Sequence, residues 1–193
     1  DERRMHGERL PFDACLGGRE VDGADPQQIA AFARGLRGIL VVEEKRAVVE
    51  DQVKALLYDL DEGTPRPRIV GKRAASAALG GDGQAWLPDF GELDPLRVAR
   101  AIAHSLHREG GQLTITSRTE DRTQRLAEEV KCKAVDWHAR HSVAFDVLIN
   151  CTPVGMHPNV NDSVVPAALL HRHRAVMDIV YNPIKTKLLR DAA

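Results

Sequence analysis

The polar residues best placed for chemistry follow an apolar run in the second half of the chain. Residues 147–149 (VLI) have the composition of a buried strand, and the segment 150–166 then brings an amide, a thiol, hydroxyls and a glycine. Parallel α/β sheets bind their ligands at such places, where a strand ends in a polar loop that contains glycine. Asn150 supplies two amide donors and an acceptor, and Gly155 allows the backbone to approach a ligand closely. The alternative is that Asn150 and Thr152 cap the next turn.

A second candidate site follows the segment QLTITS (112–117), which is expected to be a strand. In a dinucleotide-binding sheet the residue after the second strand meets the adenosine ribose, where an acid accepts from the 2′-hydroxyl and an arginine accommodates a 2′-phosphate. This chain has Arg118 and Thr119 there, with Arg122 one helical turn further on. Two guanidiniums beside a helix N-terminus suit a phosphate, because the donors and the helix dipole both favour an anion. The alternative is a solvated arginine pair at a helix start.

The elements that position these residues alternate between helix and strand. Apolar residues recur at helical spacing after the cap pairs Asp25-Pro26 and Asp94-Pro95, and apolar runs lie between the helices. The expected helices cover 26–36, 49–60, 95–109, 119–130, 166–173 and 184–192, and the expected strands cover 38–44, 67–72, 112–117, 133–137, 146–152 and 175–181. This alternation predicts a three-layer α/β fold with a mainly parallel sheet and a Rossmann-like second half.

A boundary is expected in the segment 73–93, which contains four glycines and a proline. The predicted domains are therefore residues 1–93 and 94–193. The pattern leaves open whether residues 1–93 form an independent domain or add strands to one continuous sheet. Residues 1–24 have weak periodicity and are expected to be poorly ordered.

Composition excludes several classes of protein. Of the 193 residues, 43% are hydrophobic, which is enough for a core, and 27 Lys and Arg against 28 Asp and Glu leave no basic surplus for nucleic acid. No apolar run reaches the length of about 20 residues that spans a bilayer. Three widely spaced cysteines without a C-x-x-C pair indicate a reducing, cytoplasmic location, and Cys151 is expected to be a packing residue. The pairs His138/His141 and His171/His173 have no predictable third ligand, so no metal site is expected.

Three segments together resemble the NADP-binding domain of shikimate dehydrogenase. They are LTITSRTEDRTQRLAEEV (113–130), DVLINCTPVGMHPNVNDSVVP (146–166) and AVMDIVYNPIKTKLLRDA (175–192), and the resemblance covers about residues 97–193. Their combined motifs are N-T/C-T-x-x-G-M and D-x-x-Y-N-P-x-x-T. The resemblance implies NADP as a cofactor. The implied cofactor-binding residues are Arg118, Thr119 and Arg122 at the 2′-phosphate and Asn150, Thr152, Gly155 and Met156 in the loop beside the nicotinamide, and the implied substrate-binding residue is Tyr181, near the substrate carboxylate.

The sequence also departs from this family. The family's GAGG-type phosphate turn is replaced by PDFGELDPLRVARAIAHSL (88–106), which keeps the Arg-Ala-Ile run without the glycines, so affinity for a pyrophosphate is expected to suffer. The family's N-V-T-x-P-x-K and N-T-D-x-x-G segments, which carry the catalytic lysine and aspartate, do not occur before residue 97, and the later Gln-bearing helix is also missing. Because hydride transfer needs a proton donor or acceptor within reach, no catalytic residue is assigned, and the isolated chain is expected to be inactive.

The first half resembles an internal α/β segment of the indolepyruvate ferredoxin oxidoreductases. The resemblance lies in FARGLRGILVVEEKRAVVEDQVKALLYDL (32–60), RPRIVGK (66–72) and WLPDFGELDPLRVARAIA (86–103) and covers about residues 26–103. The two resemblances overlap at 98–103, so the chain looks like a mosaic with its join there. Residues 81–83 (GDG) are similar to the start of a thiamine diphosphate motif, but no Asn follows before Asn150, and a turn is the expected structure.

Two functions of different classes follow. The first is a nicotinamide-nucleotide domain of shikimate dehydrogenase type, which retains the 2′-phosphate pocket and depends on missing parts for turnover. The second is a non-enzymatic interaction module built from enzyme segments, such as an inhibitor or an antitoxin-like neutralising partner, whose exposed strand edges or helix stripes bind another chain. The expected partners are a small-molecule nucleotide and either a protein partner or further copies of the chain, with no nucleic acid and no membrane.

Overall fold

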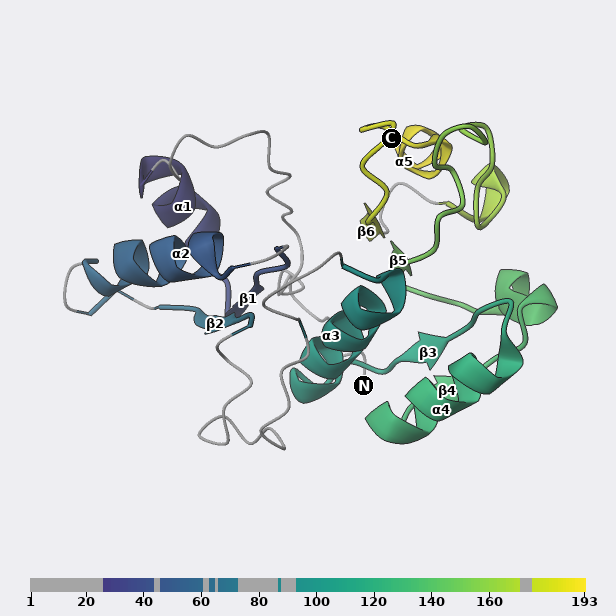
Figure 1. Cartoon of the computed structure of the whole chain (residues 1–193), viewed down its shortest axis with the longest axis horizontal. Helices are drawn as coiled ribbons and strands as arrows, with labels where there is room; N and C mark the ends of the chain where they lie inside the picture. The colour runs from purple at the N-terminus through teal and green to yellow at the C-terminus, as the bar shows by residue number, and fades with distance from the viewer. Residues whose placement is uncertain are drawn as a thin grey trace, which may run out of the picture. The chain divides into compact units, whose positions relative to one another are not determined.

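The computed structural model describes residues 26–43, 46–60, 63–64, 66–72, 87, 93–170 and 175–193 (Figure 1). The chain forms two compact units, Asp1–Leu93 and Asp94–Ala193. The predictions for residues 1–24, for the turn at 81–83 and for His171 and His173 lie outside the described residues.

In the first unit two helices pack beside one short parallel pair of strands. The elements are α1 (Pro26–Ala33), β1 (Gly38–Leu40), α2 (Val48–Tyr58) and β2 (Arg68–Val70). β1 and β2 run parallel, with Gly38 opposite Arg68 and Leu40 opposite Val70. The core consists of buried helix residues and the strand residues packed against them, namely Ile29, Ala33, Val53, Leu57, Ile39 and Ile69. The helical spacing of these apolar positions explains why both helices were predictable.

The loop after β1 caps the second helix. The carboxylate of Glu43 accepts hydrogen bonds from the backbone N–H groups of Val48 and Val49 at 3.0 and 2.9 Å and from that of Glu50 at 3.0 Å. These groups have no partner inside the helix, and a negative charge there also interacts favourably with the helix dipole. Glu43 therefore serves as the anion at the start of α2, and this strand end is a structural cap.

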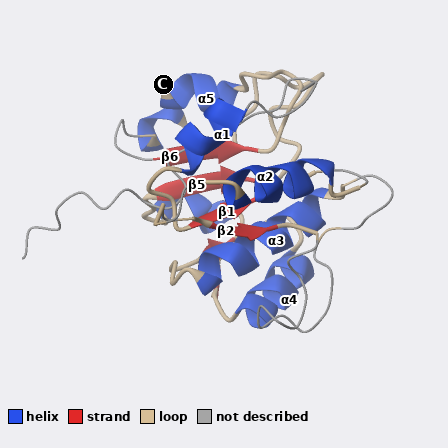
Figure 2. Cartoon of the chain, turned by 90° about the vertical axis from the view of Figure 1, so that its left-hand side faces the viewer, coloured by secondary structure: helices blue, strands red, loops and turns tan. Residues whose placement is uncertain are grey.

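The second unit continues the alternation of helices and strands. Its elements are α3 (Pro95–Arg108), β3 (Thr114–Ile115), α4 (Glu120–Val130), β4 (Lys133–Ala134), a 3₁₀ helix η3 (His138–Ser142), β5 (Val147–Asn150), a 3₁₀ turn η4 (Ala167–Leu169), β6 (Ala175–Asp178) and α5 (Lys187–Ala192). β3 pairs with β4 and β5 pairs with β6, both in parallel, and Figure 2 shows β5 beside β6. The α/β class with parallel strands is confirmed.

The strands are shorter than the sequence predicts. Within the described residues the three parallel pairs, β1–β2, β3–β4 and β5–β6, are separate sheets of two strands. A strand with a single neighbour extends as far as that neighbour forms hydrogen bonds with it. The six-residue run 112–117 therefore contributes only Thr114 and Ile115 to β3. Among the described residues, no helix combines the length and the hydrophobicity that a membrane span requires.

Two apolar cores hold the second unit together. The first joins α3, β3 and α4, and consists of Ala103, Leu126 and Val130 with Leu113, Ile115 and Cys132 packed against them. The second lies under the loops around β5 and β6, and consists of Val164, Val165 and Leu188 with Trp137, Leu148, Val154, Leu169, Leu170 and Val176. This second core supports the polar segment 150–166.

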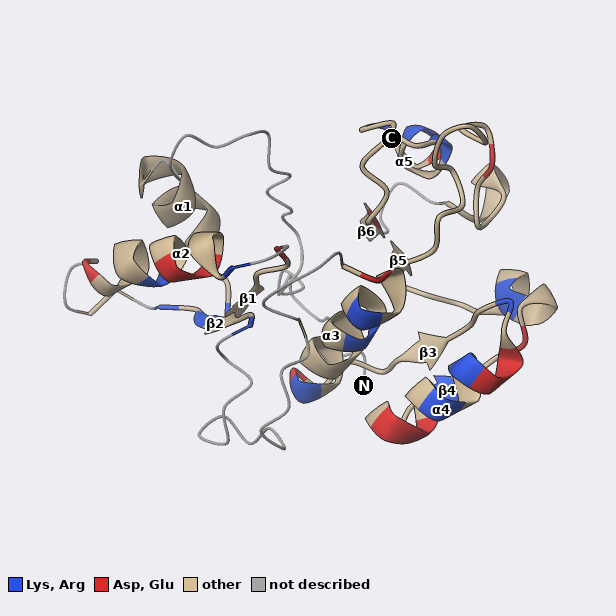
Figure 3. Ribbon diagram, in the orientation of Figure 1, with Lys and Arg blue, Asp and Glu red and all other residues tan. Residues whose placement is uncertain are grey.

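An ion cluster joins α3 to α4. Glu129 Oε1 lies 2.5 Å from Arg100 Nε and 2.6 Å from His104 Nε2, and Figure 3 shows charged residues along both helices. Burial acts to raise the pKa of Glu129, but the hydrogen bonds from His104 and Arg100 outweigh it and lower that pKa from its usual value. The cluster is partly exposed, so its contribution to stability is modest.

Candidate functional site

The polar residues at the carboxyl ends of β5 and β6 form one hydrogen-bonded network. Asn150 ends β5 directly opposite Asp178, which ends β6. The Asn150 side-chain amide donates to Asp178 Oδ1 at 3.0 Å and to the carbonyl of Val154 at 3.1 Å. Asn150 Oδ1 accepts from the backbone N–H and the hydroxyl of Thr152, at 3.0 and 2.7 Å. Asn150 is 2% exposed, and its amide group is fully occupied by Asp178 and the loop.

The network continues through Asp178 to the last helix. Asp178 Oδ1 also accepts from the backbone N–H of Val180 at 3.0 Å, and Asp178 Oδ2 accepts from the Thr186 hydroxyl at 2.7 Å. Thr186 is fully buried and is the N-cap of α5, where its oxygen accepts from the backbone N–H of Leu189 at 3.3 Å. One carboxylate therefore connects the end of β5, the turn after β6 and the start of α5.

Gly155 adopts a backbone conformation that side chains rarely take. Its φ is +90°, and a Cβ there would lie 3.1 Å from the carbonyl oxygen of Asp162 and 3.7 Å from Thr186 Cβ. The sequence predicted that glycine permits a close backbone approach at this position. The close approach found here is to other parts of the same unit, which fold the loop back on itself.

Two exposed loops lie next to this network. Met156 follows Gly155 and is 38% exposed, while Tyr181 and Ile184 are 81% and 75% exposed. The backbone N–H of His157 donates to the carbonyl of Asn182 at 3.0 Å, which ties the two loops together. The large side chains of Met156, Tyr181 and Ile184 therefore face solvent, in loops that the hydrogen bonds of the network hold in place.

The Cys151 thiol lies within this edge of the sheet. Burial and the nearby charge of Asp178 raise the pKa of Cys151 to about 12. A thiol must ionise to act as a nucleophile, so Cys151 is inert at neutral pH. This environment is consistent with the predicted packing role.

The turn between β3 and α4 places the predicted phosphate-binding residues. Ser117 Oγ donates to the carbonyl of Thr119 at 2.9 Å, accepts from the backbone N–H of Thr119 at 3.2 Å and lies 2.8 Å from Thr123 Oγ1. The Thr123 hydroxyl donates to the Thr119 carbonyl at 3.2 Å, and Thr119 is the N-cap of α4 without using its side chain as a cap. These bonds fix the backbone and leave the Thr119 hydroxyl outside the capping bonds.

The arginines of this turn are exposed. Arg118 and Arg122 both face solvent, and neither makes a hydrogen bond or ion pair with the residues that the structure describes. Glu120 and Asp121 occupy the first turn of α4 between them, and Figure 3 shows the opposite charges together at this helix start. The two carboxylates offset the two guanidiniums, so this position has the donors for a phosphate but little net positive charge.

The start of α3 carries its own anion. Asp94 is the N-cap, and its carboxylate accepts from the backbone N–H of Leu96 at 2.9 Å, while Pro95 at the first helical position has no N–H to offer. In dinucleotide-binding folds the helix that follows the first strand presents these groups to the pyrophosphate. The capped start of α3 agrees with the loss of the glycines that the sequence indicates.

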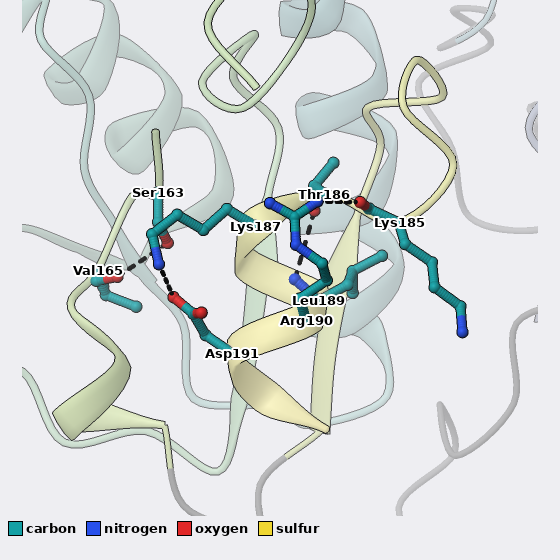
Figure 4. A network of polar contacts seen from close by, with 8 residues as sticks. All are labelled: Ser163, Val165, Lys185, Thr186, Lys187, Leu189, Arg190 and Asp191. Atoms are coloured by element: carbon teal, nitrogen blue, oxygen red, sulfur yellow. Dashed lines mark hydrogen bonds and ion pairs between the residues drawn. The ribbon is translucent and has the colours of Figure 1, made fainter. Parts of the chain in front are cut away.

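A shallow hollow of about 410 Å³ is lined by residues of the 150–166 loop, η3, η4 and α5. Its polar lining includes Arg140, His141, Ser163, Lys187 and Asp191. Lys187 Nζ pairs with Asp191 Oδ2 at 2.6 Å, and the Ser163 hydroxyl donates to the Val165 carbonyl at 2.8 Å (Figure 4). None of the predicted cofactor or substrate residues lines this hollow.

The structure brings only part of the predicted site together. Asn150, Thr152, Gly155 and Met156 form one loop beside Tyr181, whereas Arg118, Thr119 and Arg122 belong to the separate turn at the start of α4. His138 and His141 are exposed in η3, and the described residues contain no group of three metal-binding side chains. Sequence reasoning assigned no role to Asp178 and Thr186, although both belong to the D-x-x-Y-N-P-x-x-T motif.

Two family models match the chain. Residues 21–133 match the indolepyruvate oxidoreductase domain, and residues 96–182 match the family described as NADP oxidoreductase coenzyme F420-dependent. The matches overlap and fit an arrangement in two parts. The first extends further along the chain than the resemblance at 26–103 suggested.

Curated relatives give the family. The chain is 41% identical over 187 residues to the shikimate dehydrogenase (NADP(+)) of Methanosarcina mazei, covering 85% of this chain and 67% of the relative. It is 32% identical over 195 residues to that of Pyrococcus abyssi, covering 95% and 70%. Parallel strands that end in a polar, glycine-containing loop define a Rossmann-like α/β protein. The chain belongs to the shikimate dehydrogenase family.

The relatives are longer than this chain. The match to the Methanosarcina acetivorans enzyme covers 49% of the chain and 37% of that relative. Among solved structures, the shikimate 5-dehydrogenase of Thermus thermophilus in complex with NADP(H) and shikimate is 26% identical, with a TM-score of 0.46 and coverage of 86% and 67%.

Proposed function

We propose that this chain binds a nicotinamide nucleotide through the 2′-phosphate of NADP. The observation that carries the proposal is the pair of exposed guanidiniums, Arg118 and Arg122, on a turn that Ser117 and Thr123 hold rigid. A planar guanidinium donates two parallel hydrogen bonds to a phosphate. The Thr119 hydroxyl adds a further donor. The relatives are shikimate dehydrogenases (NADP(+)), which supports the same cofactor.

The binding is weak in this proposal. The Asp94 carboxylate already accepts from the first turn of α3, so a pyrophosphate there would meet a negative charge. Glu120 and Asp121 add further repulsion at the start of α4. The 2′-phosphate contacts must therefore supply much of the affinity, and binding should weaken as salt screens them.

The loop at the end of β5 shapes the nicotinamide end of the cofactor in this proposal. Asn150 and Thr152 hold the loop from within, and Gly155 and Met156 form its outer turn. Tyr181 is 81% exposed, so its hydroxyl is free to approach the carboxylate of a shikimate-type substrate. These roles rest on the family to which the chain belongs.

Turnover by the isolated chain is not expected. The sequence carries neither of the family's lysine and aspartate segments. The half-buried thiol of Cys151 has a pKa of about 12, which makes it a poor proton donor at neutral pH. A hydride transfer would leave the substrate oxygen without a partner for its proton. Incubation with NADPH and 3-dehydroshikimate should therefore show no change in absorbance at the nicotinamide band.

The experiment that tests cofactor binding is a titration of the chain with NADPH, followed by nicotinamide fluorescence. Arg118→Ala removes one charge-assisted phosphate contact and should weaken binding about tenfold. Arg125→Ala is the matched control, because Arg125 is an exposed arginine on α4, further along the chain from the turn. Equal losses for the two variants would mean that only general charge attraction is involved.

A second function is favoured by a different observation. Large apolar side chains on the first unit face solvent, namely Val48 at 54%, Val49 at 42% and Tyr58 at 78% exposed, and each described sheet has only two strands. Exposed strand edges and apolar side chains are suited to binding another chain. In this alternative the protein is a non-enzymatic interaction module that binds a protein partner or further copies of itself. Analytical ultracentrifugation over a concentration series tests it, and a monomer that binds NADPH at all concentrations argues against it.

A further inference from the structure

We infer that Asp178 and Thr186 are positioning residues, which set the conformation of the two loops that carry Met156 and Tyr181, and that Asn150 acts through this network without touching the ligand. The inference rests on the proposed nucleotide function and deepens it. It assigns roles to two residues, Asp178 and Thr186, that had none in the sequence analysis.

The first step is that both oxygens of the Asp178 carboxylate accept hydrogen bonds from within the unit. Oδ1 accepts from the Asn150 amide at 3.0 Å and from the Val180 backbone N–H at 3.0 Å, and Oδ2 accepts from the Thr186 hydroxyl at 2.7 Å. Hydrogen bonds to a charged acceptor are stronger than neutral ones. This single group therefore holds β5, the turn before Tyr181 and the start of α5 at once.

The second step is that Asn150 has no hydrogen-bonding capacity left. Its amide nitrogen serves Val154 and Asp178, and its oxygen serves both groups of Thr152. A side-chain amide has two donors and an acceptor with two lone pairs, so all four positions are used. A direct contact to the cofactor would break one of these buried bonds, which is why we assign Asn150 to the support of the loop.

The third step concerns Thr186. This residue is fully buried, and its Cβ would lie 3.7 Å from a Cβ added at Gly155. Its hydroxyl donates to Asp178 Oδ2. The same oxygen accepts from the backbone N–H of Leu189 in the first turn of α5 (Figure 4). Thr186 is therefore packed against one loop, bonded to the residue that orients the other, and fixed by the helix.

The consequence is that the network couples the conformations of the two exposed loops, which carry Met156 and Tyr181. The Met156 loop is held through Val154 and Gly155, the Tyr181 loop through Val180, and the bond from His157 to Asn182 joins them directly. A ligand that contacts this edge depends on Thr186 and Asp178, whereas a ligand bound only at Arg118 does not. This difference gives a test.

Two nucleotide probes separate the two halves of the site. 2′,5′-ADP carries the 2′-phosphate without the nicotinamide, and NADPH carries both. We expect Thr186→Val, which keeps the shape and removes the hydroxyl, to weaken NADPH about tenfold and to change the affinity for 2′,5′-ADP less than twofold. Thr186→Ser keeps the hydroxyl and should restore NADPH binding. Thr123→Val is the reciprocal control, since it makes the same chemical change in the Arg118 turn and should weaken both probes.

Two results would overturn the positioning role. NADPH affinity that is unchanged in Thr186→Val contradicts it, and so do equal losses of both probes, which would indicate a role in folding alone. If the unmodified chain binds neither probe, the proposed function fails, and hydrogen exchange without nucleotide still decides the inference. Thr186→Val should then speed exchange in both 151–157 and 180–184, and an effect on neither segment or on only one contradicts the coupling.

Discussion

Replacement of Gly155 by alanine tests how tightly the 150–166 loop is folded on itself. At a φ of +90° a residue with a Cβ is strained, and the left-handed region costs such a residue about 1–2 kcal/mol. The new Cβ would also lie 3.1 Å from the backbone oxygen of Asp162. Because that oxygen belongs to the chain and not to a flexible side chain, relieving the contact costs about 1–3 kcal/mol more. Alanine also restricts the unfolded chain, which returns about 0.4–1 kcal/mol.

Gly110→Ala is the matched control for this substitution. Gly110 has a φ of +84° in the same unit, but a Cβ there meets nothing within 4 Å. The backbone strain and the effect on the unfolded chain are therefore shared, and the difference between the variants isolates the contact with Asp162. We expect Gly155→Ala to lower the free energy of unfolding by about 1–3 kcal/mol more than Gly110→Ala does.

Urea unfolding followed by tryptophan fluorescence measures this difference. Trp137 packs against the core under the loop, and a Trp86→Phe background makes it the sole indole, since the chain has two tryptophans. Equal losses of stability in the two glycine variants would refute the reasoning. They would mean that the loop does not approach its own backbone closely at residue 155.

Three further measurements address the thiols and the α3–α4 cluster. At pH 8 the Cys151 thiol, with a pKa of about 12 against 9.0 for an ordinary thiol, should be alkylated about a thousandfold more slowly than a free cysteine, because only the thiolate reacts. Burial also raises the pKa of Cys132, but less strongly, so Cys132 should be labelled before Cys151. Mass spectrometry that finds Cys151 labelled first would contradict the environment described for the Cys151 thiol. Glu129→Gln should reduce stability by less than about 1 kcal/mol at pH 7. The folded-state pKa of Glu129 lies below its usual 4.5. The stability that Glu129 contributes is therefore present above pH 4.5 and is lost as pH falls through the folded-state value. A stability difference between the unmodified chain and Glu129→Gln that persists unchanged at pH 3 would exclude the cluster with Arg100 and His104.

The helices were predictable because their signals are local. Asp94-Pro95 marks the start of α3, and the carboxylate of Asp94 does cap it. Apolar residues at helical spacing then identify the buried face. Strand lengths were not predictable, since a strand ends where its neighbour stops bonding it, and the run 112–117 contains nothing to signal this. The 3₁₀ helix His138–Ser142 has no apolar period and was missed for that reason.

The supporting network of the site lay beyond sequence reasoning for a different reason. Asn150 and Asp178 are 28 residues apart and meet only because β5 and β6 pair in parallel and in register. The D-x-x-Y-N-P-x-x-T motif indicates that an aspartate and a threonine occur together at these positions. The hydrogen bond between Asp178 and Thr186 is given by the fold alone. By contrast, the role of Gly155 in a sharp backbone turn could be predicted, because glycine alone adopts that conformation without strain.

The most direct test of the central claim is the ratio of the affinities for NADPH and NADH, measured by isothermal titration at low ionic strength. The two molecules differ only by the 2′-phosphate, so the ratio reports the surroundings of that phosphate, which in the proposal are Arg118, Thr119 and Arg122. The account predicts that NADPH binds at least about tenfold more tightly than NADH, which corresponds to one charge-assisted phosphate contact. Equal affinities for the two, or no binding of either, would contradict it.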